Sequence, residues 1–200
     1  MLALIMAGGS GSRLNRGEKP LLAIAGRPMI SYVIDAFVDA GCEPVVVTSS
    51  QTPMTRNWCR AQNIIIHNAK GRGYIEDMIE SVEALEEEQP LFISVSDIPC
   101  IKPGIIRAIR AFYEDSGKDA CSTWVPADSA TCSDGNMPYR GIVEGIEACP
   151  AGVNIMSGSR ITETQDETKV LLRDACLTIN VNTPVSLERA EKFLRSKSRR

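Results

Sequence analysis

The chain opens with Leu2-Ala3-Leu4-Ile5-Met6-Ala7-Gly8-Gly9-Ser10-Gly11-Ser12-Arg13-Leu14, and Glu18-Lys19-Pro20-Leu21 closes this stretch. The apolar residues at its start predict a short buried strand. The glycines that follow let the backbone turn tightly and bring its N–H groups against an anion. Arg13 and Lys19 add positive charge that suits a polyphosphate. The stretch therefore predicts a phosphate-binding loop.

Other glycine-rich loops fit this stretch poorly. A Walker A loop needs Gly-Lys-Ser/Thr at a fixed distance after its first glycine, but Arg13 stands there and Lys19 is followed by proline. A dinucleotide loop needs Gly or Ala at Leu14 and an acidic residue after the second strand, where 48–50 reads Thr-Ser-Ser. A glycine turn with two solvated cations stays open, but it leaves the coincidence of strand, glycines, Arg and Lys-Pro unexplained.

Length and composition bound the other function classes. The chain has 200 residues, of which 44% are apolar, and no linker interrupts it. We expect a single domain over 1–200, with a nucleotide-binding half over about 1–116 and an acceptor-binding half over about 117–200. The net charge of −3 gives no basic footprint for nucleic acid. The sequence leaves the oligomeric state open, and a homodimer is one state it allows.

The start of the chain bears on localisation, and the cysteines bear on metal binding. The apolar start is too short for a membrane span or a signal peptide, so we expect a cytoplasmic protein without a membrane partner. The seven cysteines are scattered without a Cys-x-x-Cys pair, and the chain has a single histidine, His67. This pattern predicts free thiols and no zinc site.

Strand and helix patterns alternate along most of the chain. Helices are predicted from Pro28 to a stop at Gly41, over 53–61 and over 75–85, and strands over 44–48, 63–66, 90–95 and 120–125. This order is typical of a parallel α/β sheet flanked by helices. A last strand is predicted over 177–182, before a helix with Thr183 as N-cap and Pro184 at its first position.

Polar residues at two of these strand ends suggest a metal site. Asp97 follows the strand 90–95, and ligands of open α/β sheets lie at the carboxyl ends of strands. A carboxylate near a polyphosphate is well placed to hold Mg²⁺. The alternative is that Asp97 caps the helix that begins after Pro103, although six residues are a long distance for a cap. Asn180 and Asn182 alternate, so we expect them to point the same way.

The sequence resembles the nucleotidyltransferase superfamily, which includes sugar-phosphate and molybdenum-cofactor nucleotidyltransferases. The resemblance rests on 8–14 with Lys19-Pro20, on Asp97 before Pro99, and on 180–184. Within the superfamily, the segments 48–53, 71–77 and 150–154 are similar to the archaeal family of GTP:adenosylcobinamide-phosphate guanylyltransferases, enzymes of cobalamin assembly. The resemblance covers most of the chain and implies a Rossmann-like nucleotidyltransferase fold with a mostly parallel sheet.

The resemblance also implies a reaction: GMP passes from GTP to adenosylcobinamide phosphate, and pyrophosphate leaves. The acceptor phosphate is already a nucleophile, so no Ser, Cys or His needs activation. We expect Mg²⁺ as cofactor, held by Asp97 with Asn180 or Asn182. The expected catalytic residues are Arg13, Lys19 and Asp97. The expected nucleotide-binding residues are Ala7, Gly8, Gly9, Ser10, Gly11, Ser12, Arg13, Lys19, Thr48, Ser49, Gly73, Glu76 and Asp77. The acceptor is expected at Gly152, Asn154, Asn180 and Asn182.

Several alternatives stay open at this point. Glu76 and Asp77 either accept hydrogen bonds from guanine or only favour the dipole of their helix. A molybdenum-cofactor guanylyltransferase or a sugar-1-phosphate nucleotidyltransferase would share the loop and the metal residues but use another acceptor. A non-catalytic GTP-binding regulator would keep the loop without turnover.

Overall fold

The structure is a computed structural model that describes residues 1–9, 17–127 and 139–197. Its strands are β1 (Leu2–Met6), β2 (Ala23–Ile24), β3 (Arg27–Pro28), β4 (Glu43–Thr48), β5 (Ile65–Asn68), β6 (Pro90–Val95), β7 (Ala120–Pro126), β8 (Gly141–Val143), β9 (Ile146–Ser157) and β10 (Glu167–Leu171). Its helices are α1 (Met29–Asp39), α2 (Pro53–Ala61), α3 (Tyr74–Ala84), α4 (Pro103–Ser116) and α6 (Pro184–Lys197), with short 3-10 turns η2 (Lys19–Leu21) and η3 (Gly158–Arg160).

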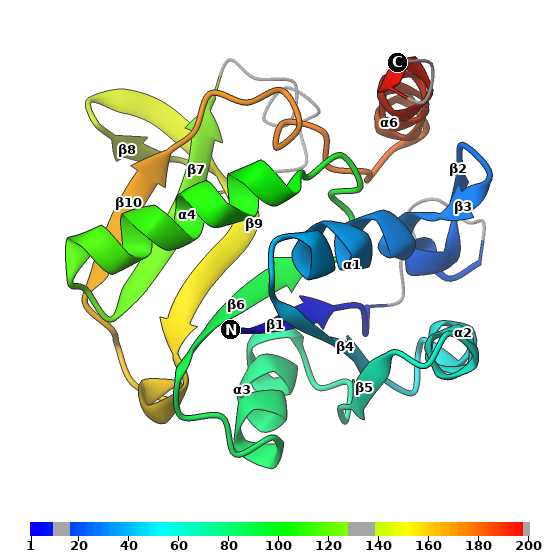
Figure 1. Ribbon diagram of the computed structural model, residues 1–200, viewed down its shortest axis with the longest axis horizontal. Helices are drawn as coiled ribbons and strands as arrows, with labels where there is room; N and C mark the ends of the chain where they lie inside the picture. The colour runs from blue at the N-terminus through cyan, green and yellow to red at the C-terminus, as the bar shows by residue number, and fades with distance from the viewer. Residues whose placement is uncertain (10–16, 128–138, 198–200) are drawn as a thin grey trace.

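One mostly parallel sheet runs through the molecule (Figure 1). Its strand order is β10-β7-β9-β6-β1-β4-β5, and β8 pairs with β9. β1 lies parallel to both β4 and β6, while β9 is antiparallel to β6 and β7. Because strand and helix alternate from β1 to α4, each crossover returns the chain in the same direction. The sheet confirms the predicted parallel α/β fold.

The residues of β1 alternate between two apolar layers. Ala3 and Ile5 belong to the core under α1 and α4, whereas Leu4 and Met6 belong to the core under α3. This alternation follows from the period of two in a strand. Phe37 of α1 meets the β6 residue Phe92 edge to face, with ring centroids 5.4 Å apart. β1 is therefore buried on both faces, as its apolar run predicts.

The predicted boundaries of α1 are confirmed. The helix begins directly after Pro28 and has Ala40 as its C-cap. Gly41 follows with a φ of 79°, a left-handed conformation that glycine adopts without strain. Arg27 of β3, just before the helix, pairs with Asp35 on the helix surface.

The predicted strand over 177–182 is wrong. Residues 175–178 form a turn, because Asp174 accepts the N–H of Cys176 with its side chain at 2.8 Å and the N–H of Leu177 with its carbonyl at 3.1 Å. Leu177 and Val181 are still buried, so the apolar alternation reports burial rather than a strand. The sheet edge is instead formed by β10, which pairs in parallel with β7.

The cysteine prediction is confirmed for part of the set. Five cysteines are free and buried: Cys42, Cys59, Cys100, Cys121 and Cys176. Cys149 is disulfide-bonded, which corrects the expectation of a free thiol at that residue. Cys132 lies outside the described residues. Burial raises the pKa of the Cys59 and Cys121 thiols to about 11, so both stay protonated near neutral pH.

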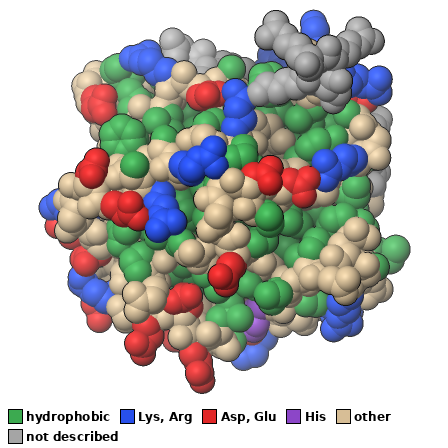
Figure 2. All heavy atoms as spheres, viewed as in Figure 1, with side chains coloured by type: hydrophobic (Ala, Val, Ile, Leu, Met, Phe, Trp, Pro, Cys, Tyr) green, Lys and Arg blue, Asp and Glu red, His purple; other side chains and the backbone are tan. Residues whose placement is uncertain are grey.

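Charged side chains of both signs are interspersed over the face that carries α1 and α4 (Figure 2). Arg110 and Glu114 of α4, for example, pair one helical turn apart at 2.8 Å. In the described part of the chain, no helix is both long and apolar enough to cross a bilayer.

Candidate functional site

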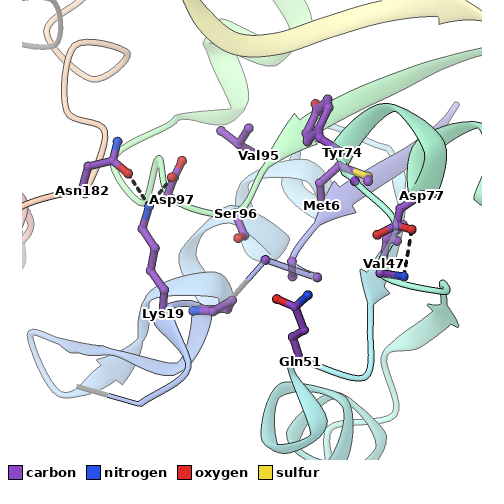
Figure 3. A pocket seen from close by; sticks show the side chains of 16 residues that line it. Met6, Lys19, Val47, Gln51, Tyr74, Asp77, Val95, Ser96, Asp97 and Asn182 are labelled. Carbon is purple, nitrogen blue, oxygen red and sulfur yellow. Dashed lines mark hydrogen bonds and ion pairs between the residues drawn. The ribbon is translucent and has the colours of Figure 1, made fainter. Parts of the chain in front are cut away.

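A cavity of about 500 Å³ lies at the carboxyl ends of β1 and β6, where the strand order of the sheet reverses. β4 and β5 extend the sheet on one side of β1, and β6 lies on the other side, so the loops after β1 and β6 diverge at their carboxyl ends. The lining residues are Met6, Ala7, Gly8, Gly9, Lys19, Pro20, Val47, Gln51, Gly71, Gly73, Tyr74, Asp77, Val95, Ser96, Asp97 and Asn182 (Figure 3). The glycine stretch and Asp97 therefore meet at one cavity, as the strand pattern predicts.

At one end of this cavity, Lys19 connects its own segment to two segments that are distant in the sequence. Its ammonium donates to Asp97 Oδ2 and, at 2.7 Å, to Asn182 Oδ1 (Figure 3). The side chains of Lys19 and Asp97 are each only 15% exposed. A buried charge pair of this kind is costly to form unless it is well hydrogen-bonded, so its place at a cavity points to a functional role.

A hydrogen bond to Asn180 fixes the orientation of the Asn182 amide. Its Nδ2 donates to Asn180 Oδ1 at 2.6 Å, which leaves Oδ1 to face Lys19. The Asn182 N–H donates to Ser186 Oγ, and Thr183 Oγ1 accepts the Ser186 N–H at 3.1 Å. Thr183 thus caps α6 as predicted. Asn180 and Asn182 form one hydrogen-bonded pair, of which Asn182 lines the cavity.

Asp97 keeps one oxygen without a hydrogen bond. Its Oδ1 is buried and has no partner among the described residues, although its backbone carbonyl accepts the Val181 N–H at 2.8 Å. A buried carboxylate oxygen without a donor suits a hard cation such as Mg²⁺. The described residues contain no group of three or more His, Cys, Asp or Glu that could hold a metal. A metal here would therefore combine Asp97 with amide oxygens and ligands from the nucleotide.

The opposite end of the cavity is formed by 71–77. Asp77 Oδ1 accepts the N–H groups of Gly71 and Arg72, each at 3.0 Å, and the Asp77 side chain is almost fully buried. The second Asp77 oxygen has no hydrogen bond to a described residue, and Asp77 lines the cavity. The carboxylate thus holds its own loop with one oxygen and has the other available for a ligand.

Tyr74 supplies a hydroxyl to the same end. Although 44% of the residue is exposed, desolvation raises the pKa of its hydroxyl to about 12, with a smaller contribution from the negative charge of Asp97. Tyr74 therefore stays neutral at physiological pH and can donate a hydrogen bond. Gln51 reaches into the cavity from the β4 side (Figure 3).

Three other expected nucleotide-binding side chains lie off the cavity lining. Thr48 and Ser49 are fully buried. Thr48 Oγ1 donates to the His67 carbonyl at 3.3 Å, and Ser49 Oγ donates to the Gly8 carbonyl at 2.6 Å. Ser49 therefore supports the glycine stretch at Gly8, whereas Thr48 ties β4 to β5. Glu76 is exposed, and its carboxylate lies against Gly73, so that a Cβ on this glycine would overlap Glu76 Oε2.

Of the two expected acceptor residues on β9, Gly152 lies beside the cavity wall, whereas the Asn154 side chain bonds to β7. Gly152 has a φ of 79°, and a Cβ on it would approach Val95 Cγ2, in the cavity lining, to 2.6 Å. Asn154 Oδ1 accepts the Thr123 N–H at 3.3 Å across the β7–β9 pair.

The structure brings eight predicted residues to the cavity lining: Ala7, Gly8, Gly9, Lys19, Gly73, Asp77, Asp97 and Asn182. Ser10, Gly11, Ser12 and Arg13 lie outside the described residues. Gln51 and Tyr74 line the cavity but were not predicted as site residues, although both lie within the segments 48–53 and 71–77 that carry the resemblance.

Residues 3–156 match the MobA-like NTP transferase domain. The chain belongs to the MobA-like NTP transferase domain family. Nucleotidyltransferases of this family generally use a divalent metal and a nucleotide substrate.

Relatives of this nucleotidyltransferase agree with the family assignment. The chain is 29% identical to adenosylcobinamide-phosphate guanylyltransferase of Methanocaldococcus jannaschii over 98% of each chain. It is 30% identical to the bifunctional protein GlmU of Heliobacterium modesticaldum, over 58% of this chain and 26% of that protein. A CTP complex of CMP:2-keto-3-deoxy-manno-octonic acid synthetase has the same fold, with a TM-score of 0.71 at 15% identity over 98% of this chain and 99% of that one.

Proposed function

We propose that this nucleotidyltransferase transfers GMP from GTP to the terminal phosphate of adenosylcobinamide phosphate. An acceptor oxygen forms a bond to the α-phosphorus, the bond from that phosphorus to the bridging oxygen breaks, and pyrophosphate leaves with the electron pair. The products are adenosylcobinamide-GDP and pyrophosphate. The proposal is supported by similarity to the Methanocaldococcus enzyme along 98% of both chains, which includes the acceptor half.

The observation that carries the chemistry is the cluster of Lys19, Asp97 and Asn182 at the cavity. Lys19 provides a positive charge for the phosphates and for the departing pyrophosphate, beside the backbone of Gly8 and Gly9. Stabilising charge and holding the reactants in line supply the rate enhancement, because the acceptor phosphate needs no activation.

Mg²⁺ fits this cluster because Asp97 Oδ1 is buried without a hydrogen bond. Asp97 and the amide oxygen of Asn182 would hold the ion, and Asn180 would orient that amide. When bound, the ion would neutralise phosphate charge and polarise the α-phosphorus.

Guanine recognition is assigned to the other end of the cavity. The free oxygen of Asp77 can accept from the N1–H and N2–H groups of guanine, while the Tyr74 hydroxyl and the Gln51 amide offer donors. Thr48 and Ser49 would act indirectly, through the backbone that they support. The corrinoid would lie along β9, near Gly152 and Asn154.

The decisive experiment measures pyrophosphate release from GTP and Mg²⁺, with and without adenosylcobinamide phosphate. ATP, CTP and UTP serve as alternative donors, and molybdopterin and sugar phosphates as alternative acceptors. We expect release only when GTP and the corrinoid are both present. Release with another acceptor would discard the cobalamin reaction, and GTP binding without release under any acceptor would favour a regulator.

A further inference from the structure

Glu18 caps a helix that begins far away in the sequence. Glu18 Oε1 accepts the Met54 N–H at 2.7 Å, and Oε2 accepts the Thr55 N–H and the Thr55 hydroxyl, both at 2.6 Å. The N-cap residue of α2, Thr52, makes no side-chain cap of its own, because its hydroxyl accepts the Ser49 N–H at 3.1 Å. Glu18 therefore satisfies the exposed N–H groups and the positive dipole end of α2.

The cap lies next to Lys19 in the chain. The Glu18 carbonyl accepts the Leu21 N–H at 3.0 Å, and the Lys19 carbonyl accepts the Leu22 N–H at 3.1 Å. These two bonds close the 3-10 turn η2 around Lys19. The Glu18 carboxylate anchors that turn to α2, while the Lys19 ammonium extends to Asp97. Glu18 thus connects the backbone of Lys19 to a helix.

The same segment also holds the other end of the glycine stretch. Ser49 Oγ donates to the Gly8 carbonyl at 2.6 Å and accepts the Gln51 N–H at 3.0 Å. Segment 49–55 therefore contacts the stretch at Gly8 and again at Glu18. Fixing both ends of a loop reduces the conformational entropy that it loses when a ligand binds.

We propose that Glu18 is a positioning residue for Lys19. By capping α2, it holds η2 in the place from which the Lys19 ammonium reaches the phosphates of the nucleotide. The inference rests on the phosphate-binding role of Lys19 in the proposed function. It concerns the donor nucleotide and does not depend on which acceptor is used. If Glu18 only stabilised the fold, its loss would weaken the protein without acting through Lys19.

A double-mutant cycle separates these two roles. The dissociation constant of GTP is measured by calorimetry for the full chain, for Glu18→Ala, for Lys19→Ala and for the double variant. We expect Glu18→Ala to raise the constant about tenfold, because a misplaced binding group loses much of its contribution. In the Lys19→Ala background, the same change should have almost no further effect. Equal effects in both backgrounds would overturn the proposal.

Two further variants keep the result interpretable. Glu18→Gln retains the size of the side chain but turns an amide N–H₂ toward a backbone donor, so we expect a smaller rise in the same constant. If Glu18→Ala does not fold, an unchanged constant in Glu18→Gln overturns the proposal. Asp119→Asn is the matched control, because Asp119 also pairs across a long stretch of sequence, with Arg160, but at the other end of the sheet. It should change the melting temperature only slightly and leave GTP binding unchanged.

The proposed function and this inference fail in different ways. If the wild-type chain binds GTP but releases no pyrophosphate with the corrinoid, the proposed reaction is contradicted. The cycle on GTP binding would still give an answer about Glu18. Conversely, a wild-type chain with the expected reaction and an additive cycle would contradict only the inference.

Discussion

The two ends of the central sheet carry their charged side chains in opposite ways. At the amino end of β7 and β10, Lys118 pairs with Asp166 at 2.6 Å, and Arg160 pairs with both Asp119 and Glu163. All of these side chains are at least 35% exposed. At the carboxyl end of β1 and β6, the paired Lys19 and Asp97 are 15% exposed, and one Asp97 oxygen has no hydrogen bond.

This difference separates structural charges from charges that can serve a ligand. The exposed pairs at the amino end have partners and are screened by solvent, so each adds little to stability. The buried pair at the carboxyl end carries a desolvation cost and leaves a buried oxygen free for a cation. Residues of the same types therefore differ in whether they are available to a ligand, because their burial differs.

Asp97→Asn should have the largest effect on activity. The change removes the negative charge beside Lys19 and replaces one of the two carboxylate oxygens with an amide nitrogen, so Mg²⁺ would be held more weakly and we expect kcat to fall by about a hundredfold or more. Steady-state pyrophosphate release at saturating GTP measures it. A Mg²⁺ titration should show a higher concentration for half-maximal rate. Wild-type kcat in this variant would show that the free oxygen has no role in turnover.

Lys19→Ala should have the next largest effect. It removes one positive charge from the proposed phosphate site, and we expect turnover to fall by more than about tenfold. The same pyrophosphate assay measures it, and circular dichroism checks that the variant is folded. Unchanged kinetics would remove Lys19 from the mechanism.

The sequence predicted the part of this site that depends on strand order. A buried β1 followed by glycines, and Asp97 directly after β6, meet at the same edge because parallel strands share their carboxyl end. The pattern also predicted α1 and the cap of α6 by Thr183, since both are encoded by local residues.

Other features depended on contacts that local patterns do not encode. The alternation of Leu177, Ile179 and Val181 predicted a strand, but Asp174 turns the chain there and β10 takes the sheet edge. The burial of Thr48 and Ser49, which bond to His67 and Gly8, likewise depends on tertiary contacts. Gln51 and Tyr74 carry no distinctive motif of their own, so only the folded cavity places them in the site.

Gly152→Ala should have an intermediate effect on the acceptor side. The residue has a positive φ, and the added methyl would push against Val95, so we expect a stability loss of about 1–3 kcal/mol. The KM for the acceptor should rise more than the KM for GTP. Gly158→Ala is the control, because its methyl would overlap the Glu87 carbonyl at the amino end of the sheet. It should lower the melting temperature without changing the ratio of the two KM values. An equal change of the ratio in both variants would contradict an acceptor role for Gly152.

Asp119→Asn should have the smallest effect on turnover. It breaks an exposed pair with Arg160, and we expect kcat and both KM values to stay within about twofold of wild type. Because the two ends of the sheet share no hydrogen-bonded partner among these residues, combining Asp119→Asn with Asp97→Asn should give additive changes in the free energies of activation and of unfolding. Pyrophosphate kinetics and urea denaturation of the two single variants and the double variant measure both quantities. A strong coupling between these positions would mean that the amino-end pairs set the geometry of the buried pair through the strands, and the separation of structural from functional charges would then no longer hold.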